Sequence, residues 1–284
     1  MRVRDVLAGA RADGRAALVG YLPAGYPTVE GSVAALTAMV DAGVDVVEVG
    51  LPYSDPVMDG PTIQRAAEVA LARGARTADT LRVVEAVAAT GVPTLVMTYW
   101  NPVERYDVDR FARDLAAAGG AGLITPDLVP EEAERWWAAS DAHDLDRVFL
   151  VAPSSTDARI ASTVAACRAF VYATSVMGVT GARDSTSTAA PDLVARTRVA
   201  ADPAGLPVGV GLGVRDGDQA AEVAGYADGV IVGSAFVRRL LDAGDDHPAG
   251  VRAVAGLAAE LAAGVRRAAP RRPLASGDRS EARA

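Results

Sequence analysis

The sequence predicts a single-domain α/β protein, a (β/α)8 barrel of the TIM type. Short runs rich in Val, Ile and Leu alternate with longer Ala- and Arg-rich segments about eight times along the chain. Nearly every run is apolar without interruption, as expected for parallel strands covered on both faces. The chain length of 284 residues is also ordinary for one such barrel.

The apolar runs predict eight strands, in order Ala17–Tyr21, Asp45–Gly50, Thr94–Thr98, Gly122–Thr125, Arg147–Val151, Phe170–Ala173, Pro207–Val210 and Gly229–Val232. The intervening segments predict helices over Val29–Ala42, Pro61–Arg73, Ala78–Ala89, Asp107–Ala118, Pro130–Ala139, Thr156–Ala165, Ala190–Ala200, Gly217–Gly225, Ser234–Ala243 and Gly250–Ala268. A first helix over Arg4–Gly14 is expected to cap the barrel floor. The alternative is a doubly wound open sheet, but residues 20–25 do not match its usual GxGxxG turn.

We expect one barrel domain over residues 1–267 and a disordered tail over residues 268–284. The tail is rich in Arg, Pro, Ser, Gly and Ala and has no apolar periodicity. No secretory signal pattern opens the chain, and no apolar run approaches the roughly 18 residues of a spanning helix. Cys167 is the single cysteine, so no intrachain disulfide can form. These features favour a cytoplasmic protein that does not enter a membrane.

Composition excludes several kinds of chemistry. The formal net charge of −8 argues against a nucleic-acid-binding surface. All 28 basic residues are arginine, so without lysine the chain can form no Schiff base with a carbonyl or with pyridoxal phosphate. Only two histidines, His143 and His247, and one cysteine are present, so we expect no metal site. Proton transfer must fall to Asp, Glu or Tyr.

The strongest candidate for that role is Glu48, which interrupts an apolar strand near its C-terminal end, where barrels place their active sites. Burial there should raise the pKa of Glu48 toward the range that is useful for acid–base catalysis. Asp59 ends the following loop, just before Gly60 and Pro61 open a helix. It is either catalytic or a helix cap. Asp55 fits an ordinary Ser-Asp-Pro turn.

Two late glycine-rich turns predict a phosphate site. Gly211 and Gly213 follow one predicted strand, while Gly233 and Ser234 follow the next and begin a short helix. Barrels commonly bind phosphate through backbone N–H groups of these two loops. Tight turns without a ligand are the alternative interpretation.

A long polar loop over residues 175–188 is expected to be a mobile lid or a disordered insertion. Tyr172 lies on the strand before it, and Tyr99 ends another strand. Each of these tyrosines could line the pocket or pack in the core.

Several stretches together resemble the α chain of tryptophan synthase. They are Glu48–Gly50, Pro52–Pro56, Asp59–Gln64, Met97–Pro102, Pro126–Leu128, Pro130–Glu132, Gly178–Gly181, Gly211–Gly213 and Gly233–Ala235, in the order of that family. The resemblance implies retro-aldol cleavage of indole-3-glycerol phosphate to indole and glyceraldehyde 3-phosphate. In this scheme the protonated indole ring is the electron sink, so neither a lysine nor a metal is required.

The resemblance also implies roles for single residues. Glu48 is expected to protonate the indole ring at C3 and to help deprotonate the side-chain hydroxyl, while Asp59 holds the ring N–H. Tyr172 matches a pocket tyrosine and Thr180 a lid threonine. The positions matched to phosphate binding are Gly181, Gly213, Gly233 and Ser234. Departures from the family pattern occur at Trp100, Val129, Val176, Met177 and Leu212.

The family's partner is a β subunit that carries pyridoxal phosphate and receives indole through a tunnel in an α2β2 complex. We therefore expect no cofactor on this chain, and we place the partner surface at Tyr53–Met58 and Asn101–Arg105. Three alternatives remain open: a stand-alone lyase of a secondary pathway, another phosphosugar-binding barrel, and a non-catalytic barrel that activates a partner.

Overall fold

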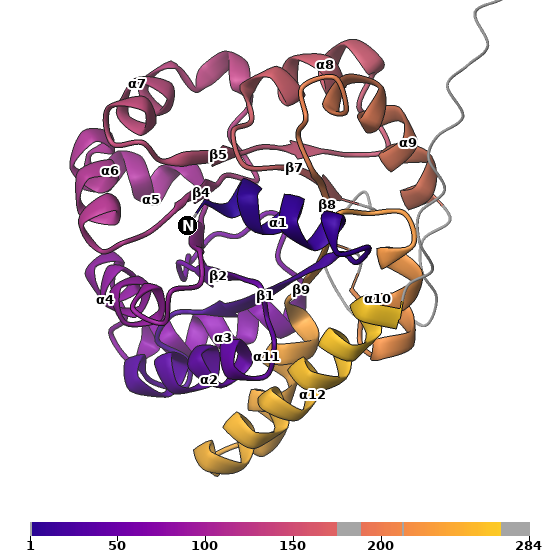
Figure 1. The fold of residues 1–284 in the computed structure, drawn as a ribbon. Coiled ribbons are helices and arrows are strands. Elements are labelled where there is room, and N and C mark those ends of the chain that lie inside the picture. Colours follow the sequence, from indigo (N-terminus) through magenta and orange to yellow (C-terminus); the bar gives the residue numbers. More distant parts are fainter. Residues whose placement is uncertain (1, 175–188, 212, 268–284) are drawn as a thin grey trace, which may run out of the picture.

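The computed structural model describes residues 2–174, 189–211 and 213–267. Parallel strands form a barrel whose outside is covered by helices (Figure 1). The described strands are β1 (Ala17–Pro23), β2 (Val46–Gly50), β3 (Thr94–Met97), β4 (Gly122–Ile124), β5 (Asp146–Val148), β6 (Leu150–Val151), β7 (Val171–Thr174), β8 (Val208–Gly211) and β9 (Gly229–Val232). The TIM-barrel prediction is confirmed.

The strand order is β5-β4-β3-β2-β1-β9-β8-β7-β6. β5 pairs with β4 and β6 pairs with β7, and only Phe149 separates β5 from β6. A single run of chain therefore joins the two ends of the sheet and closes the barrel. This run corresponds to the predicted fifth strand, so eight predicted strands become nine elements with the same topology.

The helices are α1 (Val3–Ala12), α2 (Val29–Asp41), α3 (Pro61–Ala72), α4 (Thr77–Ala88), α5 (Trp100–Tyr106), α6 (Val108–Ala117), α7 (Glu134–Ala142), α8 (Asp157–Ala166), α9 (Ala189–Ala201), α10 (Gly217–Ala224), α11 (Ser234–Ala243) and α12 (His247–Arg267), with a 3-10 turn η1 (Pro130–Glu132). Side chains cap the N-termini of several of them, as the oxygens of Thr28, Asp107, Thr156 and Asp216 accept backbone N–H groups. Helix α5 was not predicted.

The floor of the barrel is plugged by α1, as predicted. Val3, Leu7 and Ala10 of α1 are buried in one cluster with inward-facing strand residues such as Val19 and Val46. Figure 1 looks at this end of the barrel, with α1 lying across it. The candidate functional residues lie at the opposite end of the barrel, at the C-terminal ends of the strands.

Helix α12 has the length and apolar composition that a membrane-spanning helix would need. Eight of its residues are nevertheless buried, and it packs against α2, α10 and α11 on the outside of the barrel. We therefore interpret it as a covering helix of the barrel. The predicted tail over residues 268–284 lies outside the described residues.

Candidate active site

Glu48 points into the barrel. Val46, two residues earlier on β2, belongs to the floor cluster, and side chains alternate between the two faces of a strand. The register places Glu48 between Tyr21 of β1 and Leu95 of β3. The Glu48 side chain is therefore held in the upper half of the barrel, one layer above the floor.

The carboxyl group of Glu48 is buried without a partner. Glu48 is 1% exposed, and neither of its side-chain oxygens has a hydrogen-bond partner among the described residues. Burial raises its pKa from 4.5 to about 8. The raised pKa expected from the sequence is thus found, and at neutral pH this group is mainly a protonated acid that can donate a proton.

Asp59 approaches the same region from the β2–α3 loop. Gly60 is the N-cap of α3 and Pro61 is its first residue, so Asp59 lies outside the capping position. Its backbone oxygen accepts a hydrogen bond from Gln64 Nε2 at 2.8 Å. Burial raises the pKa of the Asp59 carboxyl from 3.8 to about 6, against a lowering effect of a hydrogen bond from Tyr99. The helix-cap interpretation is therefore wrong for this side chain.

Tyr99 fixes the loop that carries Asp59. Its hydroxyl accepts a hydrogen bond from the backbone N–H of Met58 at 3.0 Å and also bonds to the Asp59 carboxylate. Tyr99 is 5% exposed, and burial together with the charge of Asp59 raises the pKa of its phenol to about 12. It therefore stays protonated at any physiological pH and serves as a neutral anchor.

Tyr21 is the common neighbour of the two acids, although it was not among the predicted site residues. Burial is the largest cause of its strongly raised pKa, and the charges of Asp59 and Glu48 follow. Its ring lies against Gly50 and Gly233, where an added Cβ would meet the ring. Both carboxyl groups therefore lie within electrostatic range of one phenol. Tyr21 is the last residue of the predicted strand Ala17–Tyr21, and this position at the C-terminal end of a strand could have marked it as a site residue.

Tyr172 faces the same interior from β7. Burial and the charge of Glu48 raise its pKa well above the usual value for tyrosine. A Cβ on Gly211 would collide with the Tyr172 ring, so glycine is required there to make room for the phenol. Gly211 thus has a packing role, whether or not it also contacts a ligand.

The remaining predicted phosphate positions lie at the ends of β8 and β9. Gly213 has a φ of +72°, a backbone conformation that favours glycine. Gly233 is the N-cap of α11, and Ser234, which is 7% exposed, is its first residue. The first-turn N–H groups of α11 therefore face the end of the barrel, as in known anion sites. Thr180 and Gly181 lie outside the described residues.

Comparison with known proteins identifies the family. The model of the family described as "Tryptophan synthase alpha chain" matches residues 7–266. The chain belongs to the tryptophan synthase alpha chain family. Alpha chains of Salinispora tropica and Acidothermus cellulolyticus are 69% and 66% identical to it, over 92% and 93% of this chain and 96% and 97% of theirs. A chain of Mycobacterium tuberculosis tryptophan synthase superposes with a TM-score of 0.87 at 61% identity, covering 93% of this chain and 98% of that one.

Membership of the tryptophan synthase alpha chain family confirms the resemblance seen in the sequence. The chain is a lyase that cleaves indole-3-glycerol phosphate in tryptophan biosynthesis. An alpha chain works with a beta subunit. The alternatives of a stand-alone lyase of a secondary pathway and a non-catalytic activating barrel are not favoured.

Proposed function

We propose that Glu48 and Asp59 divide the chemistry of indole-3-glycerol phosphate cleavage between them. The observation that carries the proposal is the split of their pKa values, about 8 for Glu48 and about 6 for Asp59. At neutral pH the first is a protonated acid and the second a carboxylate. Two acids held on opposite sides of neutrality are suited to opposite tasks in one reaction.

Glu48 moves the proton. Its carboxylic acid donates a proton to C3 of the indole ring, which leaves a positive charge on the ring nitrogen. The resulting carboxylate then removes the proton from the hydroxyl on the carbon attached to C3. That carbon becomes the aldehyde of glyceraldehyde 3-phosphate, the bond to C3 breaks, and its electron pair neutralises the ring nitrogen. Glu48 ends protonated, ready for the next cycle.

Asp59 stabilises the charge that develops on the ring. As a carboxylate it accepts the indole N–H, and it gains the most when that nitrogen becomes positive. An interaction that is stronger in the transition state than in the ground state is the kind that accelerates the chemical step. The anchor at Tyr99 holds Asp59 in place for this task.

The phosphate of the substrate is assigned to the ends of β8 and β9. The N-terminus of α11, which begins at Ser234, supplies backbone N–H groups and the positive end of a helix dipole. Gly213 and Gly233 let the backbone approach the anion, and Gly211 borders the same site. Thr180 and Gly181 are assigned to the lid and to the phosphate site on the sequence resemblance alone.

We also propose an α2β2 assembly in which the beta subunit carries the pyridoxal phosphate, and we place this assembly in the cytoplasm. The chain has no lysine that could hold that cofactor as a Schiff base, and this supports assigning the cofactor to the beta subunit. The partner surface is assigned to the loop with Tyr53 and the start of α5. These segments contact each other through Asn101 Nδ2 and the Tyr53 hydroxyl at 3.0 Å, and Val57 beside them is 72% exposed.

The deciding experiment is incubation of the purified chain with indole-3-glycerol phosphate, with and without a beta subunit, followed by detection of indole. We expect slow indole release by the chain alone and a large stimulation by the partner. Full activity without the partner would contradict the partner-dependent assignment. Undiminished turnover after Glu48→Gln would contradict the assignment of the proton donor.

A further inference from the structure

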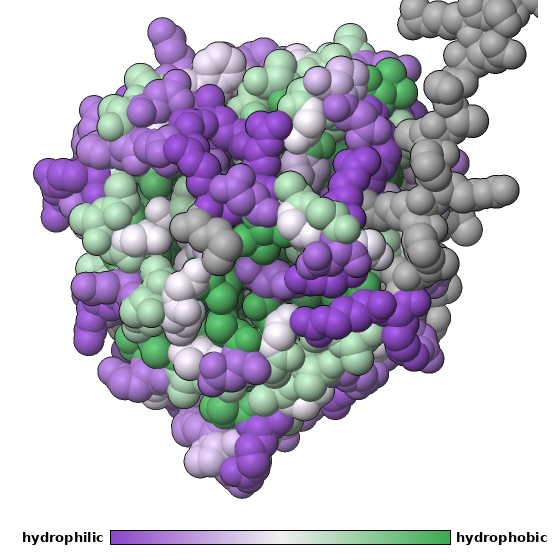
Figure 2. Space-filling model, in the orientation of Figure 1, coloured by the Kyte–Doolittle hydropathy of each residue, from purple (hydrophilic) through white to green (hydrophobic). Residues whose placement is uncertain are grey.

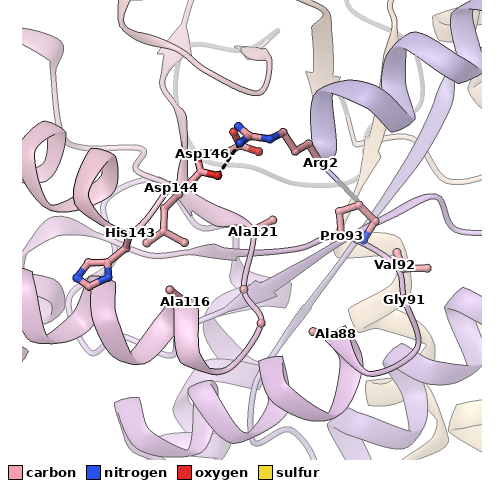
Figure 3. Close-up of a pocket in the computed structure, with 13 residues that line it drawn as sticks. Arg2, Ala88, Gly91, Val92, Pro93, Ala116, Ala121, His143, Asp144 and Asp146 are labelled. Atoms are coloured by element: carbon pink, nitrogen blue, oxygen red, sulfur yellow. Dashed lines mark hydrogen bonds and ion pairs between the residues drawn. The ribbon is translucent and has the colours of Figure 1, made fainter.

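A cavity of about 340 Å³ opens at the floor of the barrel, at the opposite end of the strands from Glu48 (Figure 3). The turns that lead into β3, β4 and β5 line it, with residues 91–93, 119–121 and 143–146, and Arg2 closes one side. Figure 2 shows this face of the molecule, where hydrophilic side chains gather beside α1. The volume lies within the range of about 300–1,000 Å³ that is typical of sites for small ligands.

The field in this cavity favours a cation. Helices α4, α6 and α7 all end in the turns that line it. Each helix C-terminus carries roughly half a negative charge on its last carbonyl groups. The titratable side chains of the lining are Arg2, His143, Asp144 and Asp146. Arg168, beside the cavity, pairs with Asp144, and its charge also acts on Asp146. Two carboxylates and three helix ends therefore face two arginines and one histidine.

Asp146 is the buried acid of this cavity. It begins β5, and its backbone N–H donates to the oxygen of Ala121 at 2.8 Å, which fixes its position at the cavity wall. The residue is 5% exposed, and burial raises its pKa. Within the described part of the chain, no hydrogen bond or ion pair reaches its carboxylate. The charges of Arg168 and Arg2 act on this carboxylate without a hydrogen bond, so its oxygens remain open to a donor from the cavity.

The two arginines whose charges act on Asp146, Arg168 and Arg2, both form ion pairs with another acid. Arg2 Nη2 lies 2.5 Å from Asp144 Oδ2, and both of these side chains are more than half exposed. Arg168 pairs with the other oxygen of Asp144 at 2.9 Å. Figure 3 shows the Arg2–Asp144 pair at the rim of the cavity. The cavity is therefore bordered by the ion-paired Asp144, while Asp146 has the charges of Arg168 and Arg2 nearby but no hydrogen bond from either.

We propose that this floor cavity binds a small organic cation whose guanidinium head is seated on Asp146. A guanidinium is planar and presents several N–H donors, so it can satisfy both oxygens of one carboxylate. Its aliphatic part would lie against the alanine and valine side chains of the wall, such as Ala88, Val92 and Ala116. The site is separate from the lyase centre and does not depend on the proposed catalytic roles.

The test is titration of the full chain with n-butylguanidinium, followed by calorimetry and by NMR of the backbone amides. The uncharged n-butylurea has nearly the same shape and serves as the control ligand. We expect saturable binding of one n-butylguanidinium per chain, with amide shifts in residues 119–121 and 143–146, and at least tenfold weaker binding of the urea. Absence of saturable binding, or equal binding of both compounds, would overturn the proposal.

Variants locate the site. Asp146→Asn should weaken n-butylguanidinium binding at least tenfold, whereas Asp192→Asn, at an exposed acid on α9, should leave it unchanged. Ala116→Met fills the cavity from α6 without changing any charge and should also abolish binding, which decides the matter if Asp146→Asn does not fold. Indole production should persist in every folded variant. Wild-type affinity in either Asp146→Asn or Ala116→Met would refute the assignment.

Discussion

The hydroxyl of Tyr99 accepts the backbone N–H of Met58 at 3.0 Å. Tyr99 follows β3 and is the N-cap of α5, while Met58 belongs to the loop after β2, so one phenol ties that loop to the β3–α5 connection. The same hydroxyl bonds to the carboxylate of Asp59. The position and the charge state of Asp59 therefore depend on Tyr99.

Replacing Tyr99 by phenylalanine should change the pH dependence as well as the rate. The Tyr99 hydrogen bond lowers the pKa of Asp59, so its loss should raise that pKa above about 6 and move the acid limb of kcat/KM to higher pH. We expect a several-fold loss of kcat/KM at pH 6.5. Tyr106→Phe is the matched control, since its hydroxyl bonds to Asp114 outside the barrel. An unmoved acid limb would show that Tyr99 does not tune Asp59.

The wild-type enzyme should show a bell-shaped pH profile of kcat/KM. The active form needs Asp59 ionised and Glu48 protonated. Activity should therefore rise through a pKa of about 6 as Asp59 loses its proton, and fall through a pKa of about 8 as Glu48 does. In Glu48→Gln the residual activity should lack the alkaline limb. An alkaline limb that persists in this variant would assign it to another group.

Glu48→Gln should lower kcat by a factor on the order of 10²–10⁴, which is the usual contribution of a positioned acid–base group. Glutamine keeps the size of the side chain but cannot donate a proton to C3. Steady-state release of indole measures the effect, with Glu85→Gln on the exposed face of α4 as control. A loss of less than a few-fold would exclude Glu48 as the proton donor.

The same substitution should stabilise the fold at alkaline pH. The pKa of Glu48 is raised from 4.5 to about 8, so the folded state binds the proton more tightly than the unfolded state. Wild-type stability should therefore decline as the pH rises from about 4.5 to about 8, by a few kcal/mol at about 1.4 kcal/mol per pKa unit. Glu48→Gln removes this loss. Urea unfolding at pH 5 and pH 9 should show a gain at pH 9 that is much smaller at pH 5, and a gain independent of pH would contradict the assignment.

Asp59→Asn should reduce kcat severely, because a neutral amide cannot offset the charge on the indole nitrogen. Asp55→Asn in the same loop is the comparison. The Asp55 carboxylate bonds to the Ser54 hydroxyl at 2.5 Å and is exposed, as a turn residue would be, so its loss should be mild. Equal defects in the two variants would indicate that loop structure, rather than the charge of Asp59, matters for turnover.

The strands and the main acid could be predicted because they depend on local pattern. An apolar run with one carboxylate near its end predicts both β2 and the buried Glu48. The break at Phe149 could not be predicted, because the pattern of apolar residues does not reveal which neighbouring strand each part of a run will pair with. Barrel closure is a property of the whole sheet.

Helix α5 and the role of Tyr21 could not be predicted either, because both depend on contacts that are distant in the sequence. Trp-Asn-Pro resembles a turn, and the group that caps α5 is remote: the Asp127 carboxylate accepts the Trp100 N–H at 2.9 Å from another loop. Tyr21 looks like one more apolar strand residue until the register places it beside Glu48. In each case the contacting residue lies on another strand or loop, so the sequence around Trp100 or Tyr21 does not indicate the contact.

The plug formed by α1 determines the route by which a small product can leave the barrel. With Leu7 and its neighbours filling one end of the barrel, a small neutral molecule formed beside Glu48 cannot escape along the axis in that direction. It must depart by the mouth through which the substrate came, past the loop with Tyr53. Any subunit docked over that mouth would receive each released molecule before the solvent does.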